Sequence, residues 1–127
     1  MMSGYESYKN NSVMTAKPEE LTLMLYEGAI KFNNQAMVAI DEKNMQEAHR
    51  LITKVEDIIL EFKSTLNMDY EVSKNMYDMY DYIYRRLTEA NVKKDKSALV
   101  EIHEYLQGFR DTWKEAMTKS NADVVNA

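Results

Sequence analysis

The segment Lys96–Ser120, KSALVEIHEYLQGFRDTWKEAMTKS, carries the clearest structural pattern of the chain. Its apolar residues recur at alternating intervals of three and four positions, which places them on one side of an α-helix. They are Leu99, Ile102, Leu106, Phe109, Trp113 and Ala116. A pattern of this kind is typical of the seam of a helical bundle.

Three earlier segments also have helical spacing. Pro18 suits the first position of a helix that runs to about Asp41, and Glu19 and Glu20 favour the positive end of its dipole. Further helices are predicted over residues 44–66 and 70–91. Their inward positions are Ala48, Leu51, Ile52, Val55, Ile58, Ile59, Phe62 and Leu66, then Met76, Tyr80, Ile83, Leu87 and Ala90. Strict alternation of apolar and polar residues is absent, so no strand is predicted.

The connectors near residues 41–44, 67–69 and 92–95 are short and polar. Loops this short make consecutive helices antiparallel neighbours. We therefore predict an all-α fold, an antiparallel up-down-up-down four-helix bundle over residues 17–120. Residues 1–16 are predicted to form a flexible N-terminal arm and residues 121–127 a disordered C-terminal tail.

The composition excludes several classes of function. A net charge of −5 over 127 residues argues against duplex nucleic acid as a ligand. The absence of cysteine removes disulfides, zinc fingers and thiol catalysis, and fits a reducing compartment. No apolar run is long enough to cross a membrane, and MMSGYESYKN lacks the features of a secretory signal. We expect a cytoplasmic protein without membrane insertion.

A carboxylate di-metal centre is the main catalytic option for a four-helix bundle, and it needs Glu-x-x-His on two helices. The residues three before His49 and His103 are Gln46 and Val100, so the pattern fails at both. A Gly-rich phosphate loop and a nucleophile elbow are also missing. We predict no enzymatic activity, no catalytic residue, no metal and no cofactor.

The first helix has more apolar surface than a bundle corner needs. One seam comprises Leu21, Leu25, Gly28, Phe32 and Ala36, and a second stripe lies nearly opposite it at 100° per residue. Tyrosines flank the seams of the third and fourth helices. Methionine and tyrosine side chains suit a partner that arrives as helices or as an unfolded segment. The predicted partner-binding residues are Leu23, Tyr26, Ile30, Met37, Tyr77, Tyr84 and Tyr105.

The predicted N-terminal arm carries Tyr5, Tyr8, Val13 and Met14, which no helical pattern explains. These residues suit a cover that lies over one apolar stripe and moves aside for a partner. An irregular bundle would also explain the second stripe, and exposed stripes can pair in a homodimer of the free protein. The oligomeric state therefore stays open.

Three stretches resemble the flagellar secretion chaperone family FliS. They are TAKPEELTLMLYEGAIKF from Thr15, MYDYIYRRLTEANVKKDKSAL from Met79 and FRDTWKEAM from Phe109. They occur in the family's order and spacing, and the resemblance covers nearly the whole chain. One departure is Lys17, where the family often has a small hydroxyl residue, and this weakens the expected N-cap.

The resemblance implies a cytoplasmic bundle without catalysis that binds the disordered C-terminal segment of flagellin. It also implies that binding prevents premature polymerisation and assists delivery to the flagellar type III export gate. In this family the N-terminal arm can cover part of the binding surface. The alternative is an adaptor that sequesters another disordered helical flagellar protein, such as a regulator.

Overall fold

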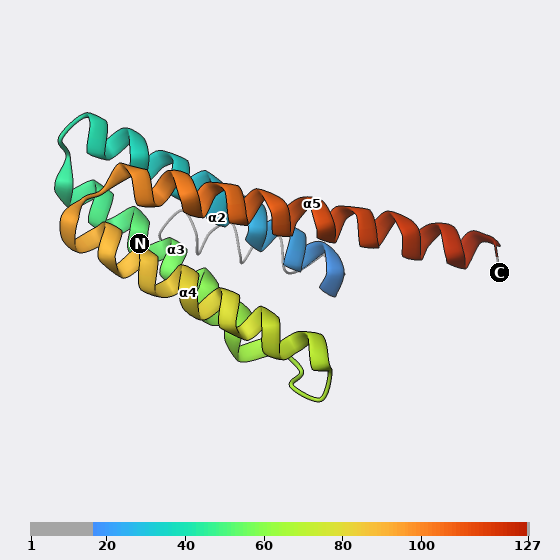
Figure 1. Cartoon of the computed structure of the whole chain (residues 1–127). Coiled ribbons are helices and arrows are strands. Elements are labelled where there is room, and N and C mark those ends of the chain that lie inside the picture. Colours follow the sequence, from blue (N-terminus) through green and yellow to red (C-terminus); the bar gives the residue numbers. More distant parts are fainter. Residues whose placement is uncertain (1–16, 127) are drawn as a thin grey trace.

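The computed structural model describes residues 17–126, with side chains as far as residue 119. This part of the chain forms four helices and no strand: α2 (Pro18–Asp41), α3 (Met45–Thr65), α4 (Glu71–Lys93) and α5 (Lys96–Asn126). Consecutive helices run in opposite directions (Figure 1). The predicted all-α four-helix bundle is confirmed. The residues of the predicted N-terminal cover, Tyr5, Tyr8, Val13 and Met14, lie outside the described residues.

At the start of two helices, α3 and α5, a side chain accepts a bond from a free backbone N–H group. Pro18 occupies the first turn of α2, as predicted. The backbone N–H of Glu47 donates to Asn44 Oδ1 at 3.2 Å, which caps α3. The backbone N–H of Ser97 donates to Asp95 Oδ1 at 2.9 Å at the start of α5. The Ser97 hydroxyl donates to the same oxygen, and this bond, together with the backbone bond, holds the pKa of Asp95 below its usual value.

Two lysines reverse the chain direction at short turns. Lys43 has φ 60° after α2, and Lys94 has φ 52° after α4, both in the left-handed region. Lys94 and Asp95 are the whole connection between α4 and α5. An ion pair of 2.8 Å between Lys96 Nζ and Asp41 Oδ2 joins the start of α5 to the end of α2.

The principal contacts join α2 to α3, α3 to α4, α4 to α5 and α5 back to α2, so the helices occupy the corners of a square. The core is aliphatic along most of its length. It also contains an aromatic layer with one ring from each helix: Tyr26, Phe62, Tyr80 and Phe109. The Tyr26 and Phe62 centroids lie 4.4 Å apart. Stacked rings of this kind add about 0.5–1.5 kcal/mol beyond their buried area.

The prediction that Tyr26 and Ile30 lie on an outer stripe is wrong. Both are buried in the core, and Tyr26 is only 3% exposed. The cause is that α2 packs against both α3 and α5, so about 180° of its circumference is buried rather than one narrow arc. Both apolar stripes of α2 therefore face neighbours within the bundle.

The pair α2 and α5 and the pair α3 and α4 move apart toward one end of the bundle. Figure 1 shows the α3–α4 connection projecting away from the start of α2 and from α5. We call this the open end. The Trp113 indole N–H donates to the Glu19 backbone oxygen at 2.8 Å, which holds α5 against the first turn of α2 there.

The helix α5 is longer than predicted. It continues through residues 121–126, over which the sequence predicted a disordered tail. No glycine or proline follows Gly108, and nothing local therefore stops the helix. Figure 1 shows α5 extending well past the other helices.

Candidate partner-binding surface

The seven residues predicted to bind a partner lie at separate places. Tyr26 and Ile30 belong to the core, and Leu23 and Met37 are half-buried on α2. The burial of Tyr26 raises the pKa of its hydroxyl, because the charged form would lose solvation. These four residues do not form one exposed stripe.

Tyr77 and Tyr84 lie on α4. Tyr77 is exposed, and the ammonium group of Lys63 from α3 lies 4.6 Å from its ring centroid. Lys63 also pairs with Asp81 at 3.1 Å, which holds the pKa of Asp81 below its usual value. Tyr84 is half-buried and packs against the core. Any partner contact with Tyr77 would therefore meet the Lys63 ammonium group as well.

Tyr105 lies where α5 passes α4, and its ring meets Tyr82 edge to face with centroids 6.1 Å apart. Both rings are exposed. Asp78, Met79 and Ile83 complete a shallow, largely apolar pocket of about 200 Å³, which we call the α4–α5 pocket. Of its five residues, the sequence had singled out only Tyr105 as a partner contact.

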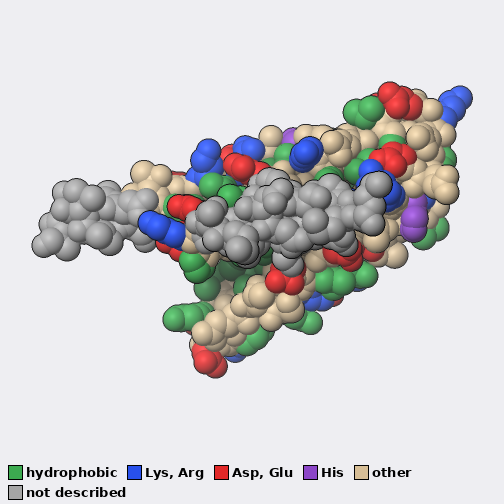
Figure 2. Space-filling model, turned by 180° about the vertical axis from the view of Figure 1, so that it is seen from behind, with side chains coloured by type: hydrophobic (Ala, Val, Ile, Leu, Met, Phe, Trp, Pro, Cys, Tyr) green, Lys and Arg blue, Asp and Glu red, His purple; other side chains and the backbone are tan. Residues whose placement is uncertain are grey.

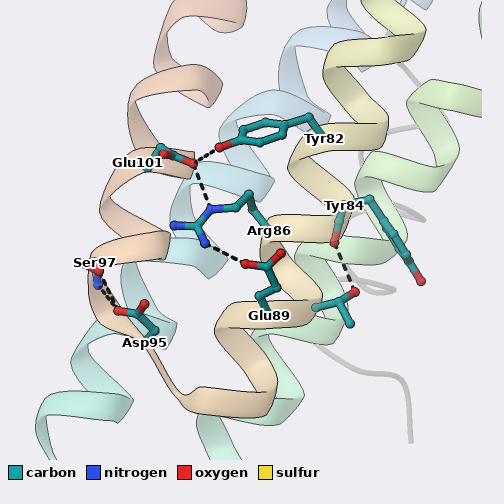
Figure 3. A network of polar contacts seen from close by, with 8 residues as sticks. Tyr82, Tyr84, Arg86, Glu89, Asp95, Ser97 and Glu101 are labelled. Carbon is teal, nitrogen blue, oxygen red and sulfur yellow. Dashed lines mark hydrogen bonds and ion pairs between the residues drawn. The ribbon is translucent and has the colours of Figure 1, made fainter.

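A polar network borders the α4–α5 pocket on one side (Figure 3). The Tyr82 hydroxyl donates to Glu101 Oε1 at 2.9 Å, and Arg86 Nε donates to the same oxygen at 3.1 Å. These two bonds hold the pKa of Glu101 below its usual value. Arg86 also pairs with Glu89 at 2.8 Å. The network fixes the Tyr82 ring and binds α4 to α5.

Further apolar side chains are exposed at the open end. Figure 2 shows hydrophobic side chains gathered on the projecting α3–α4 connection. The exposed members of this region are Leu60, Met68, Tyr70 and Val72. Leu60 lies near the end of α3, Val72 lies in the first turn of α4, and Met68 and Tyr70 lie in the connection between them.

The opposite face, between α2 and α3, is more strongly charged. A hollow of about 420 Å³ there is lined by Glu27, Gly28, Lys31, Phe32, Gln35, Arg50 and Lys54. Lys54 Nζ lies 5.0 Å from the centroid of the Phe32 ring. Figure 2 shows basic and acidic side chains interspersed over this part of the surface. The lining of this hollow is much more polar than that of the α4–α5 pocket.

The structure offers no candidate metal centre among the described residues, because no three histidine, cysteine, aspartate or glutamate side chains come together there. His49 Nδ1 instead lies 2.9 Å from Asn91 Nδ2, a contact that joins α3 to α4. No helix within residues 17–126 is long and apolar enough to cross a membrane.

The fold and the exposed apolar side chains of α4, α5 and the open end define a helical-bundle binding protein. A model of the family described as flagellar protein FliS matches residues 1–120. The chain belongs to this family, as its sequence motifs predicted.

Two relatives named flagellar secretion chaperone FliS show how far the similarity extends. The protein of Bacillus subtilis (strain 168) is 45% identical over 119 residues, which cover 94% of this chain and 90% of that protein. The protein of Salmonella typhimurium (strain LT2) is 28% identical over 126 residues, covering 94% and 93%. A solved structure described as a flagellar chaperone from bacteria has a TM-score of 0.75 at 24% identity. It covers 91% of this chain and 95% of its own, and it supports the fold.

Proposed function

We propose that this flagellar secretion chaperone binds the disordered C-terminal segment of flagellin in the cytoplasm. Binding hides the segment that would otherwise polymerise, and the complex is delivered to the flagellar type III export gate. The chaperone takes part in no catalytic step. Membership of the FliS family supports the general role, and the proposal extends it to a particular partner.

The observation that carries the proposal is the exposure of apolar side chains on helices of an otherwise well-packed bundle. Met79, Tyr82 and Tyr105 are each about two-fifths exposed, although they border the core. A disordered partner loses about 2–5 kcal/mol or more in ordering when it binds, so it needs extended apolar contact rather than one deep pocket. The α4–α5 pocket and the open end provide such contact along one side of the molecule.

The remaining predicted contacts fit this proposal in part. Tyr77, Tyr84 and Tyr105 lie on the two helices that border the exposed apolar surface, and Leu23 and Met37 are half-buried on α2. We propose these five as contacts, and we propose that the N-terminal residues Tyr5, Tyr8, Val13 and Met14 cover part of the surface in the free protein. Tyr26 and Ile30 are omitted because the core already buries them.

Titration calorimetry with the C-terminal segment of flagellin from the same bacterium tests the proposal. We expect a one-to-one complex with a large negative change in heat capacity, because apolar surface is buried. Flagellin monomers mixed with the chaperone should also polymerise more slowly than monomers alone. An absence of heat and of a complex on gel filtration would contradict the proposal.

The same binding experiments, with a disordered flagellar regulator in place of flagellin, test the alternative function as an adaptor. If a disordered flagellar regulator forms a complex with the chain and flagellin does not, the adaptor function is correct. Gel filtration of the free chain over a range of concentrations will show whether it forms a homodimer.

A further inference from the structure

Gly108 is a glycine that the bundle itself does not require. It lies in the middle of α5, where glycine costs about 1 kcal/mol relative to alanine. A Cβ atom built there would meet no described atom within 4 Å, and the backbone has no positive φ. Neither packing among the described residues nor backbone conformation explains the missing side chain. A glycine on an open helix surface lets another backbone approach closely.

Gly108 belongs to a row of residues on the side of α5 that borders α4. Glu101, Tyr105, Gly108 and Thr112 follow one another at intervals of four, three and four. The matching row on α4 is Asn75, Met79, Tyr82 and Arg86, with the same spacing. We call the two rows together the α4–α5 face.

The two rows have a fixed register. Arg86 and Tyr82 both bond Glu101, and the Tyr82 ring meets Tyr105. Because the helices run antiparallel, Gly108 is the α5 position opposite Met79 when it is counted in this register. Met79, Tyr82 and Tyr105 line the α4–α5 pocket, and Gly108 follows Tyr105 by one turn toward the end at which α4 and α5 separate.

Such a surface has the form that accepts a helix. Each row spans three turns, or about 16 Å, which matches a helical segment of about eleven residues. An aliphatic side chain of that segment would enter the α4–α5 pocket, and a small residue would lie over Gly108. A helix with its own apolar stripe can pack against rows that have this 3-4 spacing.

The charges along the rims indicate which charge the bound segment should carry beside its apolar stripe. Asp78 and Glu104 are exposed on the α4 and α5 rims, and neither forms an ion pair among the described residues. The guanidinium group of Arg86 is already paired with Glu89 and Glu101. A segment with lysine or arginine beside its apolar stripe therefore complements these rims, whereas an acidic segment is repelled.

We infer that the α4–α5 face binds a short amphipathic helix of the exported partner, which crosses α5 at Gly108. The helix has an aliphatic residue for the α4–α5 pocket, a small residue over Gly108 and a basic flank. This inference rests on the proposed function and adds to it the place, the length and the chemistry of one bound segment.

Replacing Gly108 tests whether the partner helix lies close to the α5 backbone at this position. Gly108→Ala and Gly108→Leu both add a good helix former in open space, so we expect the free chain to become more stable. Gly108→Leu should nevertheless weaken binding of the flagellin C-terminal segment about tenfold or more, because the new side chain occupies the place of the helix. Gly108→Ala should weaken it less. Lys114→Leu is the control, since Lys114 is exposed on α5 and lies about 120° further around the helix.

The charge is tested separately by Asp78→Lys, which should weaken binding several-fold and reduce the association rate. Asp57→Lys makes the same change at an exposed position of α3 and should leave binding unchanged. If the unmodified chain binds the segment and Gly108→Leu binds it equally well, this inference is wrong and the proposed function stands. If the unmodified chain does not bind the segment, both are wrong.

Discussion

The hydroxyl oxygens of Tyr26 and Tyr80 lie 2.7 Å apart inside the bundle, so each tyrosine is the other's hydrogen-bond partner. Tyr26 comes from α2 and Tyr80 from α4, which occupy diagonal corners of the square and share no principal contact. The bond therefore crosses the centre of the core, within the aromatic layer.

A double-mutant cycle should show that the two hydroxyls act as a pair. Tyr26→Phe or Tyr80→Phe alone leaves one buried hydroxyl without a partner, and should lower the free energy of unfolding by about 1–3 kcal/mol. The double variant removes both hydroxyls and should be less destabilised than the two single changes added together. Urea denaturation measures all four proteins. Strict additivity would mean that the hydroxyls do not depend on each other.

The same pair should make the fold sensitive to alkali. Burial raises the pKa of both hydroxyls above the value of 10.0 for an exposed tyrosine, so the folded state keeps protons that the unfolded state releases. The stabilisation is fully present below pH 10. It is lost above pH 10 at up to about 1.4 kcal/mol per pH unit for each tyrosine. Unfolding curves between pH 9 and 11 should show a smaller decline in the Tyr26→Phe, Tyr80→Phe double variant; equal declines would contradict this assignment.

Two substitutions of Asn33 that are similar in size should have very different effects on the free energy of unfolding. Its side chain is fully buried, and Nδ2 donates to the Leu99 backbone oxygen at 2.8 Å, but Oδ1 has no partner among the described residues. Asn33→Asp places a charge in that position and should cost about 3 kcal/mol or more. Asn33→Leu removes the unpaired oxygen together with the bond, and should change stability by no more than about 1 kcal/mol. Thermal unfolding followed by circular dichroism compares the two, and a larger loss for Asn33→Leu would show that the bond to Leu99 dominates.

Trp113 should control the order of the first turn of α2. Trp113→Phe keeps a ring but removes the bond to the Glu19 backbone oxygen, at an expected cost of about 1 kcal/mol. Amide hydrogen exchange should become faster near the start of α2 and stay unchanged near its end at Asp41. Uniform acceleration along α2 would show instead that the whole bundle had been weakened.

The sequence predicted the helices well because their apolar spacing directly reflects burial. Phe62, Tyr80 and Phe109 were placed on inward seams and meet in the aromatic layer. Tyr26 was misplaced because a helical wheel does not show how closely each neighbour packs, and α2 has the most extensive contacts of the four helices.

Most of the exposed surface could not be predicted for a different reason. Tyr82 and Tyr105 are 23 positions apart, and only the register between α4 and α5 brings their rings together. A sequence gives the spacing along each helix but not the relative shift of two helices. The exposed residues of the α3–α4 connection, such as Met68, lie outside the helices, where apolar spacing does not predict burial.

The two-residue connection through Lys94 and Asp95 therefore sets the register of the whole α4–α5 face. Every facing pair is counted from this turn, with Arg86 and Glu101 nearest to it and Tyr82 and Tyr105 one turn further on. One inserted residue in the turn would advance all of α5 by one position and swing Tyr105 about 100° around its helix. The length of this connection is thus as much a determinant of the surface as the side chains on it.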